Sequence, residues 1–264
     1  MAKRWNKTEE RDKRVELKRL YIKENKTIDE IAKLLNIGES SAYKRLLRLG
    51  IKPIPFKKKT YRNINRSIIV PKRYSEDLAE FVGTLLGDGH ITPTQVVVTL
   101  GTKDKYADHV SALMKNLFGI YPKITTRRSN EIVVYVGSTT LVRWFLKMGL
   151  VYNKVKAQVD IPSWCVSRKK YMARVVRGLI DTDGSVYKLK YGTQISFCNR
   201  SLPLLTSVRN LLVQLGFHPS KISGHNVYLT QRGDLIKYFK EIGFGNKKHE
   251  KRFLDFFNKG QLGE

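Results

Sequence analysis

Apolar residues recur at helical spacing through the first fifty positions of the chain, interrupted by two short polar breaks. Residues 11–24 predict one helix with a buried side. Thr27, followed by Glu three residues later, is the sequence of a capping box and predicts a second helix through Asn36. A third helix is predicted over 39–49, so we expect a small all-α head over 1–50. The apolar positions that this pattern turns inward are Val15, Leu17, Leu20, Tyr21, Ile31, Leu35, Ala42, Leu46 and Leu49.

A nine-residue pattern occurs twice in the remainder of the chain. Residues 81–89 and 176–184 each combine an apolar run, a small residue near the middle and a closing Asp-Gly, and they lie 95 residues apart. The segments that follow each copy also correspond, at offsets between 93 and 97 residues. We therefore predict an α+β fold of two pseudo-symmetric αββαββα units, 74–162 and 163–264, because a repeat with only two copies indicates an internal pseudo-dimer.

Alternating polar and apolar residues predict the strands of both units. The predicted strands are 96–100, 123–128 and 132–136 in the first unit and 186–191, 194–197 and 227–230 in the second. In the second unit Lys188 and Lys190 alternate with Tyr187, Leu189 and Tyr191, and in the first unit Lys123 and Arg127 alternate in the same way. We expect the lysine faces of the sheets to be open and the other faces to pack on helices.

Charge narrows the class of partner. The chain has 50 Lys and Arg against 23 Asp and Glu, a net charge of +27, and both the first 73 residues and the remainder share in the excess. Such an excess opposes compaction and favours a polyanionic partner such as nucleic acid. A membrane-surface protein is the alternative, but no basic amphipathic helix with a continuous apolar face stands out.

Cysteines and termini suggest an intracellular protein. Cys165 and Cys198 form no CxxC pair, which disfavours a structural zinc site. The N-terminal residues are followed by no apolar run, so we expect no signal peptide, no membrane span and a location in the cytoplasm, nucleoid or an organelle matrix.

The positive charge suggests that the head and the segment after it contact nucleic acid. The head is typical of a helix-turn-helix, whose last helix enters the major groove of DNA, and a helical bundle for protein contacts is the alternative. Residues 51–73 lack periodicity and predict a basic linker along the phosphate backbone, or a solvated tether. The expected DNA contacts here are Ser40, Ser41, Tyr43, Lys44 and Arg48 in the third helix, and Lys57, Lys58 and Lys59 in the linker.

The duplicated pattern also predicts a metal site. Gly83 and Gly87 in one copy, and Gly178 and Thr182 in the other, lie four residues apart on one helix face, which allows two helices to approach closely. Their C-terminal ends would then bring Asp88 and Asp183 together. Paired carboxylates at the negative ends of two helices suit a hard cation such as Mg²⁺. The alternative is that each Asp-Gly merely ends its helix.

Residues 75–250 resemble the LAGLIDADG homing endonuclease family in its monomeric, two-motif form. The resemblance rests on FVGTLLGDG and VRGLIDTDG, which depart from the family pattern at Phe, Val and Thr in the first copy and at Arg in the second. It implies a DNA-binding saddle and a monomer that needs no protein partner. It also implies cleavage of both strands of a long, asymmetric double-stranded DNA target.

By the same resemblance, catalysis needs two or three Mg²⁺ ions shared by Asp88 and Asp183. Gly87 and Thr182, which directly precede them, are expected at the metal site. The basic residues expected to assist are Lys154 and Lys247, from an Asn-Lys pair that is repeated 93 residues apart. The sheet residues expected to contact DNA are Lys123, Arg127, Arg128, Lys188 and Lys190.

Two other functions use the same fold. A DNA-binding regulator would have lost cleavage, and relatives of that kind usually lose the acidic positions, which are both present here. An RNA-binding maturase would keep the basic face. An intein is disfavoured, because residues 260–264 lack a His-Asn splicing terminus.

Overall fold

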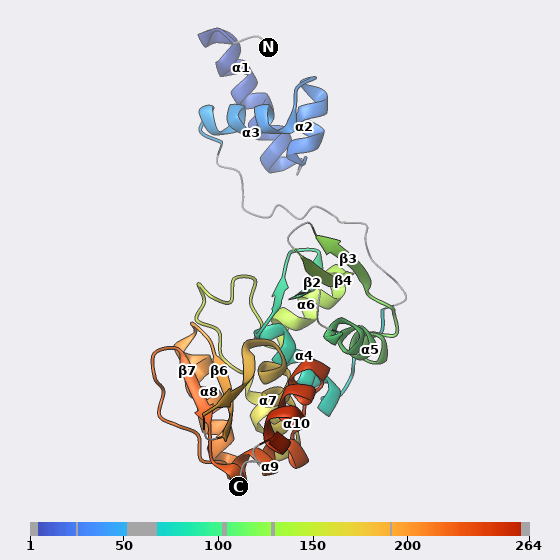
Figure 1. Ribbon diagram of the computed structural model, residues 1–264. Coiled ribbons are helices and arrows are strands. Elements are labelled where there is room, and N and C mark those ends of the chain that lie inside the picture. The colour runs from blue at the N-terminus through green and yellow to red at the C-terminus, as the bar shows by residue number, and fades with distance from the viewer. Residues whose placement is uncertain are drawn as a thin grey trace. The chain divides into compact units, whose positions relative to one another are not determined.

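The computed structural model describes residues 5–24, 26–51, 68–101, 105–127, 130–190 and 192–259. The chain divides into two compact units, a head over 1–62 and a main body over 63–264 (Figure 1). Of the predicted linker, Lys57, Lys58 and Lys59 lie outside the described residues, as does Arg128 of the first sheet. The last part of the linker belongs to the main body, because the N–H of Ile69 donates to the carbonyl of Phe118 at 2.9 Å.

The head contains the three predicted helices. They are α1 (Lys7–Lys18), extended by a π-helical turn η1 (Arg19–Lys23), α2 (Ile28–Leu34) and α3 (Glu39–Arg48). The predicted capping box is present, with the Thr27 hydroxyl accepting from the Glu30 N–H and the Glu30 carboxylate accepting from the Thr27 N–H. A second capping box, from Asn6 to Glu9, begins α1 four residues earlier than predicted. Val15, expected inside, is 71% exposed.

The first half of the main body has the predicted order of elements. These are α4 (Glu76–Leu86), β1 (Gly89–Ile91), β2 (Gln95–Gly101), α5 (Tyr106–Phe118), β3 (Lys123–Arg127), β4 (Glu131–Gly137) and α6 (Thr139–Lys147). The strands form one antiparallel sheet in the order β1-β2-β4-β3. Strand β1, only three residues long, is required by the predicted order, although the sequence analysis assigns no residues to it.

The second half repeats this order with two differences. After the 3-10 turn η2 (Ser163–Val166) it contains α7 (Lys169–Asp183), β5 (Gly184–Leu189), β6 (Gly192–Cys198), α8 (Leu202–Gln214), β7 (Asn226–Leu229) and α9 (Arg232–Glu241). Its antiparallel sheet has the order β5-β6-β7, so that within the described residues one strand follows α8 where two were expected. Helix α10 (Lys247–Lys259), which was not predicted, follows α9 and packs on β5 and β6.

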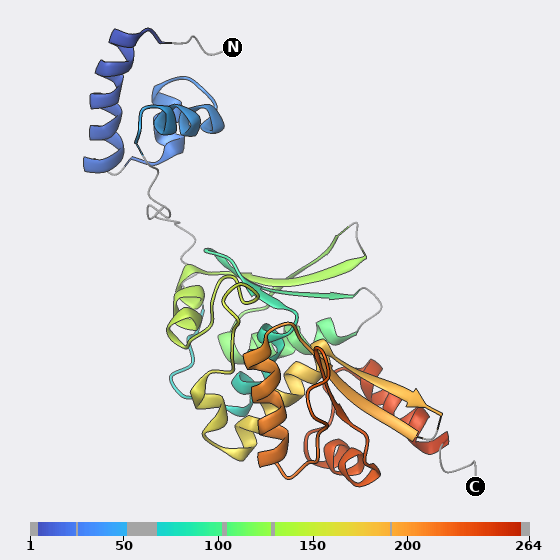
Figure 2. The ribbon, with the colours of Figure 1, turned by 90° about the vertical axis from the view of Figure 1, so that its left-hand side faces the viewer.

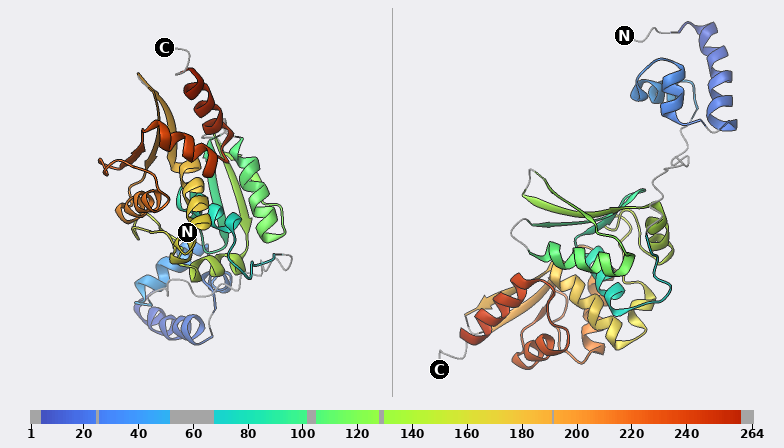
Figure 3. Two further views of the ribbon diagram at one scale, coloured as in Figure 1. Left: turned by 90° about the horizontal axis from the view of Figure 1, so that it is seen from below. Right: turned by 90° about the vertical axis from the view of Figure 1, so that its right-hand side faces the viewer.

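The two sheets flank the central helices α4 and α7 (Figure 2). Helices α5 and α6 cover one face of the first sheet (Figure 3), and a single apolar core joins both halves. In the first sheet Lys123 and Arg127 have exposed side chains on the edge strand β3, as expected.

The expected orientation of β5 is wrong. Val186 is buried in the core, and Lys188 shares its side of the strand because the two residues are two positions apart. The opposite side carries Tyr187 and Leu189, which are 49% and 42% exposed rather than packed on helices. The open face of this sheet is thus aromatic and uncharged along β5, and Lys188 lies on the helix-covered side where the strand ends.

Candidate active site

Helices α4 and α7 approach each other so closely that main-chain atoms touch. A Cβ at Gly178 would lie 2.2 Å from the carbonyl oxygen of Glu80, and a Cβ at Gly83 would lie 2.3 Å from that of Val175. Any larger residue would force the helices apart, because these neighbours are backbone atoms. The two glycines therefore set the distance between the halves, as the spacing in the sequence predicted.

The same crossing brings the two helix ends together. Gly87 follows the last residue of α4, and a Cβ added to it would lie 3.5 Å from the carboxyl carbon of Asp183, the last residue of α7. Asp88 follows Gly87 directly and is half-buried, as Asp183 is. The N–H of Thr99 on β2 donates to the carbonyl of Asp88 at 3.1 Å, which ties this acidic residue to the first sheet.

Lys154 reaches this point from the loop after α6. Its ammonium donates to the carbonyls of Leu86 at 2.9 Å and Leu85 at 3.3 Å, and to that of Gly87. These are carbonyls at the C-terminal end of α4, which lack partners inside the helix. Burial lowers the pKa of Lys154, whereas the carboxylates of Asp183 and Asp88 act to raise it. The lysine is thus close enough to both acidic residues to feel their charge.

The second acidic residue lies in a partly enclosed environment. Burial raises the pKa of Asp183, opposed by the charge of Lys154 and by a hydrogen bond from Asn199, whose Nδ2 donates to Oδ2 of Asp183 at 2.6 Å. Beside it lies a cavity of about 260 Å³ whose polar lining includes Lys154, Asp183, Asn199 and Arg200. A cavity with this mixture of acidic and basic groups can accept a phosphate together with a cation.

The donor set fits a magnesium ion that is completed by substrate. Within the described residues no group of three or more His, Cys, Asp and Glu side chains converges on one point, so the chain supplies two carboxylates and nearby carbonyls. Mg²⁺ prefers oxygen ligands and is commonly held by one or two carboxylates plus substrate phosphates and water. The Thr182 hydroxyl is engaged with the carbonyls of Gly178 and Leu179, which leaves its main-chain carbonyl as the candidate ligand.

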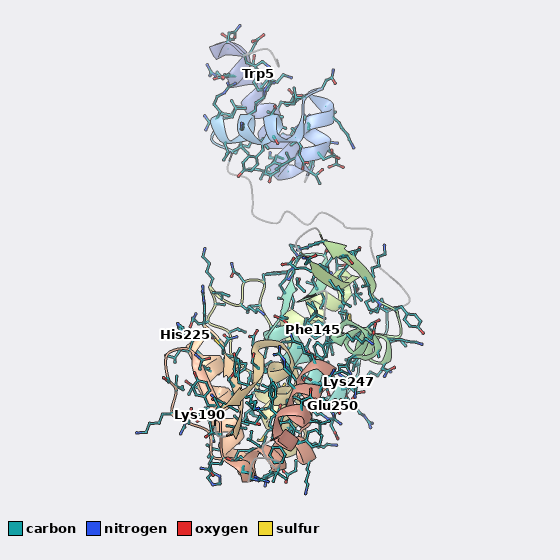
Figure 4. All side chains as sticks on the ribbon, viewed as in Figure 1. Trp5, Phe145, Lys190, His225, Lys247 and Glu250 are labelled. Carbon is teal, nitrogen blue, oxygen red and sulfur yellow. The ribbon has the colours of Figure 1, made fainter. Side chains whose placement is uncertain are left out.

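The second half ends its central helix differently. There the Asn246 side chain, not a lysine, donates to a helix carbonyl, that of Asp181, at 3.0 Å. Lys247 begins α10, is 72% exposed and pairs with Glu250 at 2.7 Å. Both side chains are labelled in Figure 4. The repeated Asn-Lys pair therefore occupies different surroundings in the two halves, and the catalytic role expected for Lys247 remains a prediction.

A buried polar network that the sequence did not indicate surrounds the helix crossing. The carboxylate of Glu80 lies 2.6 Å from His109, 3.2 Å from Arg174 and 3.5 Å from Arg177. One helical turn or so further along the crossing, Asp181 accepts hydrogen bonds from the N–H groups of Gly245 and Asn246, and burial raises its pKa to about 7. The only signal in the sequence is Asp181 itself, the first Asp of the VRGLIDTDG copy.

The remaining predicted DNA contacts lie on exposed surfaces. In the head these are Ser40, Ser41, Tyr43, Lys44 and Arg48, all exposed on α3. Arg48 is held by Glu10 of α1 at 2.6 Å. In the main body Lys188 and Lys190 are exposed near the end of β5, and Lys190 is labelled in Figure 4. No helix in the described parts of the chain could cross a membrane.

Comparison with known proteins finds a family match within the second half. Residues 170–243 match the profile of the LAGLIDADG-like domain. Among solved structures, the homing endonuclease I-DmoI in complex with DNA and Ca is 19% identical with a TM-score of 0.49, and covers 63% of this chain and 88% of its own. The N-terminal LAGLIDADG domain of DUF199/WhiA is 16% identical with a TM-score of 0.47, and covers 66% of this chain and 86% of its own.

Curated relatives share a stretch with this chain that is a small part of their own length. An A-type ATP synthase component of Pyrococcus abyssi is 27% identical over 167 residues, which is 62% of this chain and 16% of the relative. The glutamine–fructose-6-phosphate aminotransferase of Methanocaldococcus jannaschii is 22% identical over 244 residues, 87% of this chain and 22% of the relative. The small replication factor C protein of the same organism is 24% identical over 192 residues, 69% and 10% respectively. The family match thus covers residues 170–243, which begin within α7 and end just beyond α9 and are similar to the LAGLIDADG-like domain.

Proposed function

We propose that the protein is a site-specific, Mg²⁺-dependent DNA endonuclease that cuts both strands of a long, asymmetric target. The observation that carries the proposal is the convergence of the C-terminal ends of α4 and α7. A Cβ added to Gly87 would lie only 3.5 Å from the carboxyl carbon of Asp183. If each Asp-Gly merely ended its helix, the two helix ends would not need to converge beside the half-buried Lys154 and a polar cavity.

The chain's own residues supply the remaining chemistry. Asp88 and Asp183 would hold divalent cations together with the carbonyls of Gly87 and Thr182. When bound, Mg²⁺ supplies Lewis acidity toward a phosphodiester and lowers the pKa of water. Asn199 fixes one oxygen of Asp183, and Lys154 neutralises the acidic pair from the side of α4. Arg200 lines the same cavity, where it would offset the charge of a bound phosphate.

DNA would be bound by the sheets and, on one flank, by the head. Lys123 and Arg127 on β3 are suited to phosphates, and the uncharged open face of β5 is suited to base edges and thymine methyl groups. Helix α3 of the head would contribute a further segment of the site. The net charge of +27 supports a polyanion as partner.

The curated relatives support a self-contained module. Their names describe three different activities, yet each shares with this chain a stretch that amounts to 22% of its length or less. A segment that a synthase, an aminotransferase and a replication factor all share is not the part that carries out these three different activities. It is more simply a domain carried within larger proteins, as expected for an endonuclease that spreads between genes.

Selection from a randomised duplex library tests the proposal. The purified chain is incubated with the library and Mg²⁺, and cut ends and bound duplexes are recovered separately. Recovery of cut sites with breaks in both strands is expected. Enrichment of bound duplexes without breaks would instead identify a DNA-binding regulator, and preference for RNA would identify a maturase.

Substitution of the acidic pair assigns the site. Asp88→Asn and Asp183→Asn each remove one negative charge without changing shape, and are expected to abolish double-strand cleavage while binding persists. Asp255→Asn is the matched control, because Asp255 is an exposed residue of α10. Cleavage of both strands by either active-site variant at the wild-type rate would refute the assignment of these ligands.

A further inference from the structure

Lys154 has the geometry of a bound cation rather than of a free basic side chain. A lysine ammonium has three N–H donors. Here they face three successive carbonyls of α4, those of Leu85, Leu86 and Gly87. The side chain is half-buried and comes from a loop some 70 positions away in the sequence, so this placement is a specific tertiary contact.

The surroundings of Lys154 carry concentrated negative charge. The C-terminal ends of α4 and α7 carry partial negative charge, and each also presents a carboxylate, from Asp88 and Asp183. Asn199, which donates to Asp183, is neutral. The charge of Lys154 interacts favourably with both carboxylates.

We propose that Lys154 is the counter-ion of the metal-free site and that it competes with a divalent cation for the carbonyl of Gly87. The inference rests on the proposed function only in taking the acidic pair as a metal site. Because Lys154 holds one of the expected metal ligands, its ammonium leaves that oxygen when a divalent ion arrives. The lysine thereby keeps the acidic helix ends together before metal binds and weakens the affinity for metal.

Among the described residues of the second half, no lysine takes the equivalent place. Its central helix receives the Asn246 amide at the carbonyl of Asp181, and Lys247 is directed to Glu250 instead. Lys154 therefore differs from its counterpart Lys247, and a single substitution removes its contact with the Gly87 carbonyl. This asymmetry allows a sharp test.

The test measures metal binding and thermal unfolding of the full chain without DNA. Mg²⁺ is titrated into the wild type, Lys154→Gln and Lys154→Met by calorimetry, and the unfolding temperature is recorded with and without Mg²⁺. Lys154→Gln retains amide donors for the α4 carbonyls, so it folds even where Lys154→Met does not. Lys156→Met is the matched control, because Lys156 is an exposed lysine of the same loop.

Both Lys154 variants are expected to bind Mg²⁺ at least tenfold more tightly than the wild type. They are also expected to unfold at a lower temperature without Mg²⁺ and to recover more of that loss when it is added, whereas Lys156→Met behaves like the wild type. Asp183→Asn should weaken Mg²⁺ binding in every background.

The outcomes separate this inference from the proposed function. Equal or weaker Mg²⁺ binding by Lys154→Gln, with binding still dependent on Asp183, would overturn the competition and leave the metal site intact. Absence of Mg²⁺ binding in the wild type and in both Lys154 variants would overturn both. Tight binding by both Lys154 variants, with none by the wild type, would support the competition in its strongest form.

Discussion

The α4–α7 crossing makes a quantitative prediction for Gly178→Ala. The new Cβ would lie 2.2 Å from the Glu80 carbonyl oxygen and 2.8 Å from the Thr84 nitrogen, whereas ordinary contact begins near 3.4 Å. The helices must therefore separate by about 1 Å at their closest point. Overpacking of this kind costs about 1–3 kcal/mol, and the upper end applies here because the obstructing atoms are main-chain atoms.

Alanine also brings a gain, which must be subtracted. In a helix interior it is favoured over glycine by about 1 kcal/mol. The net expectation is a loss of about 2 kcal/mol in the free energy of unfolding, or about 4–8 °C in the unfolding temperature for a protein of this size. Gly233→Ala is the matched control, because Gly233 lies in α9 with no atom within 4 Å of an added Cβ. It is expected to stabilise the protein by up to about 1 kcal/mol.

Hydrogen exchange of peptides from α4 and α7 is the appropriate assay, since unfolding of the head does not enter it. Protection of these peptides should fall in Gly178→Ala and be unchanged or higher in Gly233→Ala. If Gly178→Ala protected the two helices as well as the wild type does, main-chain contact would not be what sets their distance.

Two further predictions concern buried groups. Because burial raises the pKa of Asp181 to about 7, the folded protein between pH 4 and pH 7 binds a proton that the unfolded chain has released. The free energy of unfolding should therefore fall as the pH rises through this range and level off above it. Urea unfolding at pH 5 and pH 8 should show a smaller decrease in this free energy for Asp181→Asn than for the wild type. Equal decreases in the two proteins would contradict this reasoning. Cys165 is buried, and burial raises the pKa of its thiol, whereas Cys198 is exposed. A thiol reagent should modify one cysteine rapidly in the folded protein and the second only on unfolding, and two rapid reactions would show that Cys165 is accessible.

The repeat predicted most of the fold because helix crossings leave a mark in the sequence. Gly83 and Gly178 have to be small, and because Asp88 and Asp183 follow them at equal spacing, the sequence predicts that both acidic residues lie beyond the crossing on the same side. The capping box at Thr27 was predictable for a similar reason, since it depends on residues three positions apart.

Alternation along β5 separated its two faces but could not tell which face is covered. The lysines predict an open side, yet Val186, on the same side as Lys188, is buried, and the opposite side exposes Tyr187. What decides the matter is the packing of the helices behind the strand, a tertiary property that periodicity does not contain.

The contacts of the candidate site were least predictable where they join distant segments. Asn199 meets Asp183 because β6 lies beside β5, and Lys154 meets the end of α4 because its loop returns across the main body. The Asn-Lys repeat suggested two equivalent lysines, whereas Asn246 takes the helix-end contact in the second half.

The joint between the halves is made of backbone, and this has a consequence for how the protein diverges. Gly83 and Gly178 fix the distance between α4 and α7 through main-chain contacts, which do not depend on the identity of the surrounding side chains. The outward residues of each sheet can then drift separately while the span between the halves stays constant. Homologous proteins with this helix crossing would therefore keep the same length of DNA target, even after the sequences bound by the two halves had diverged.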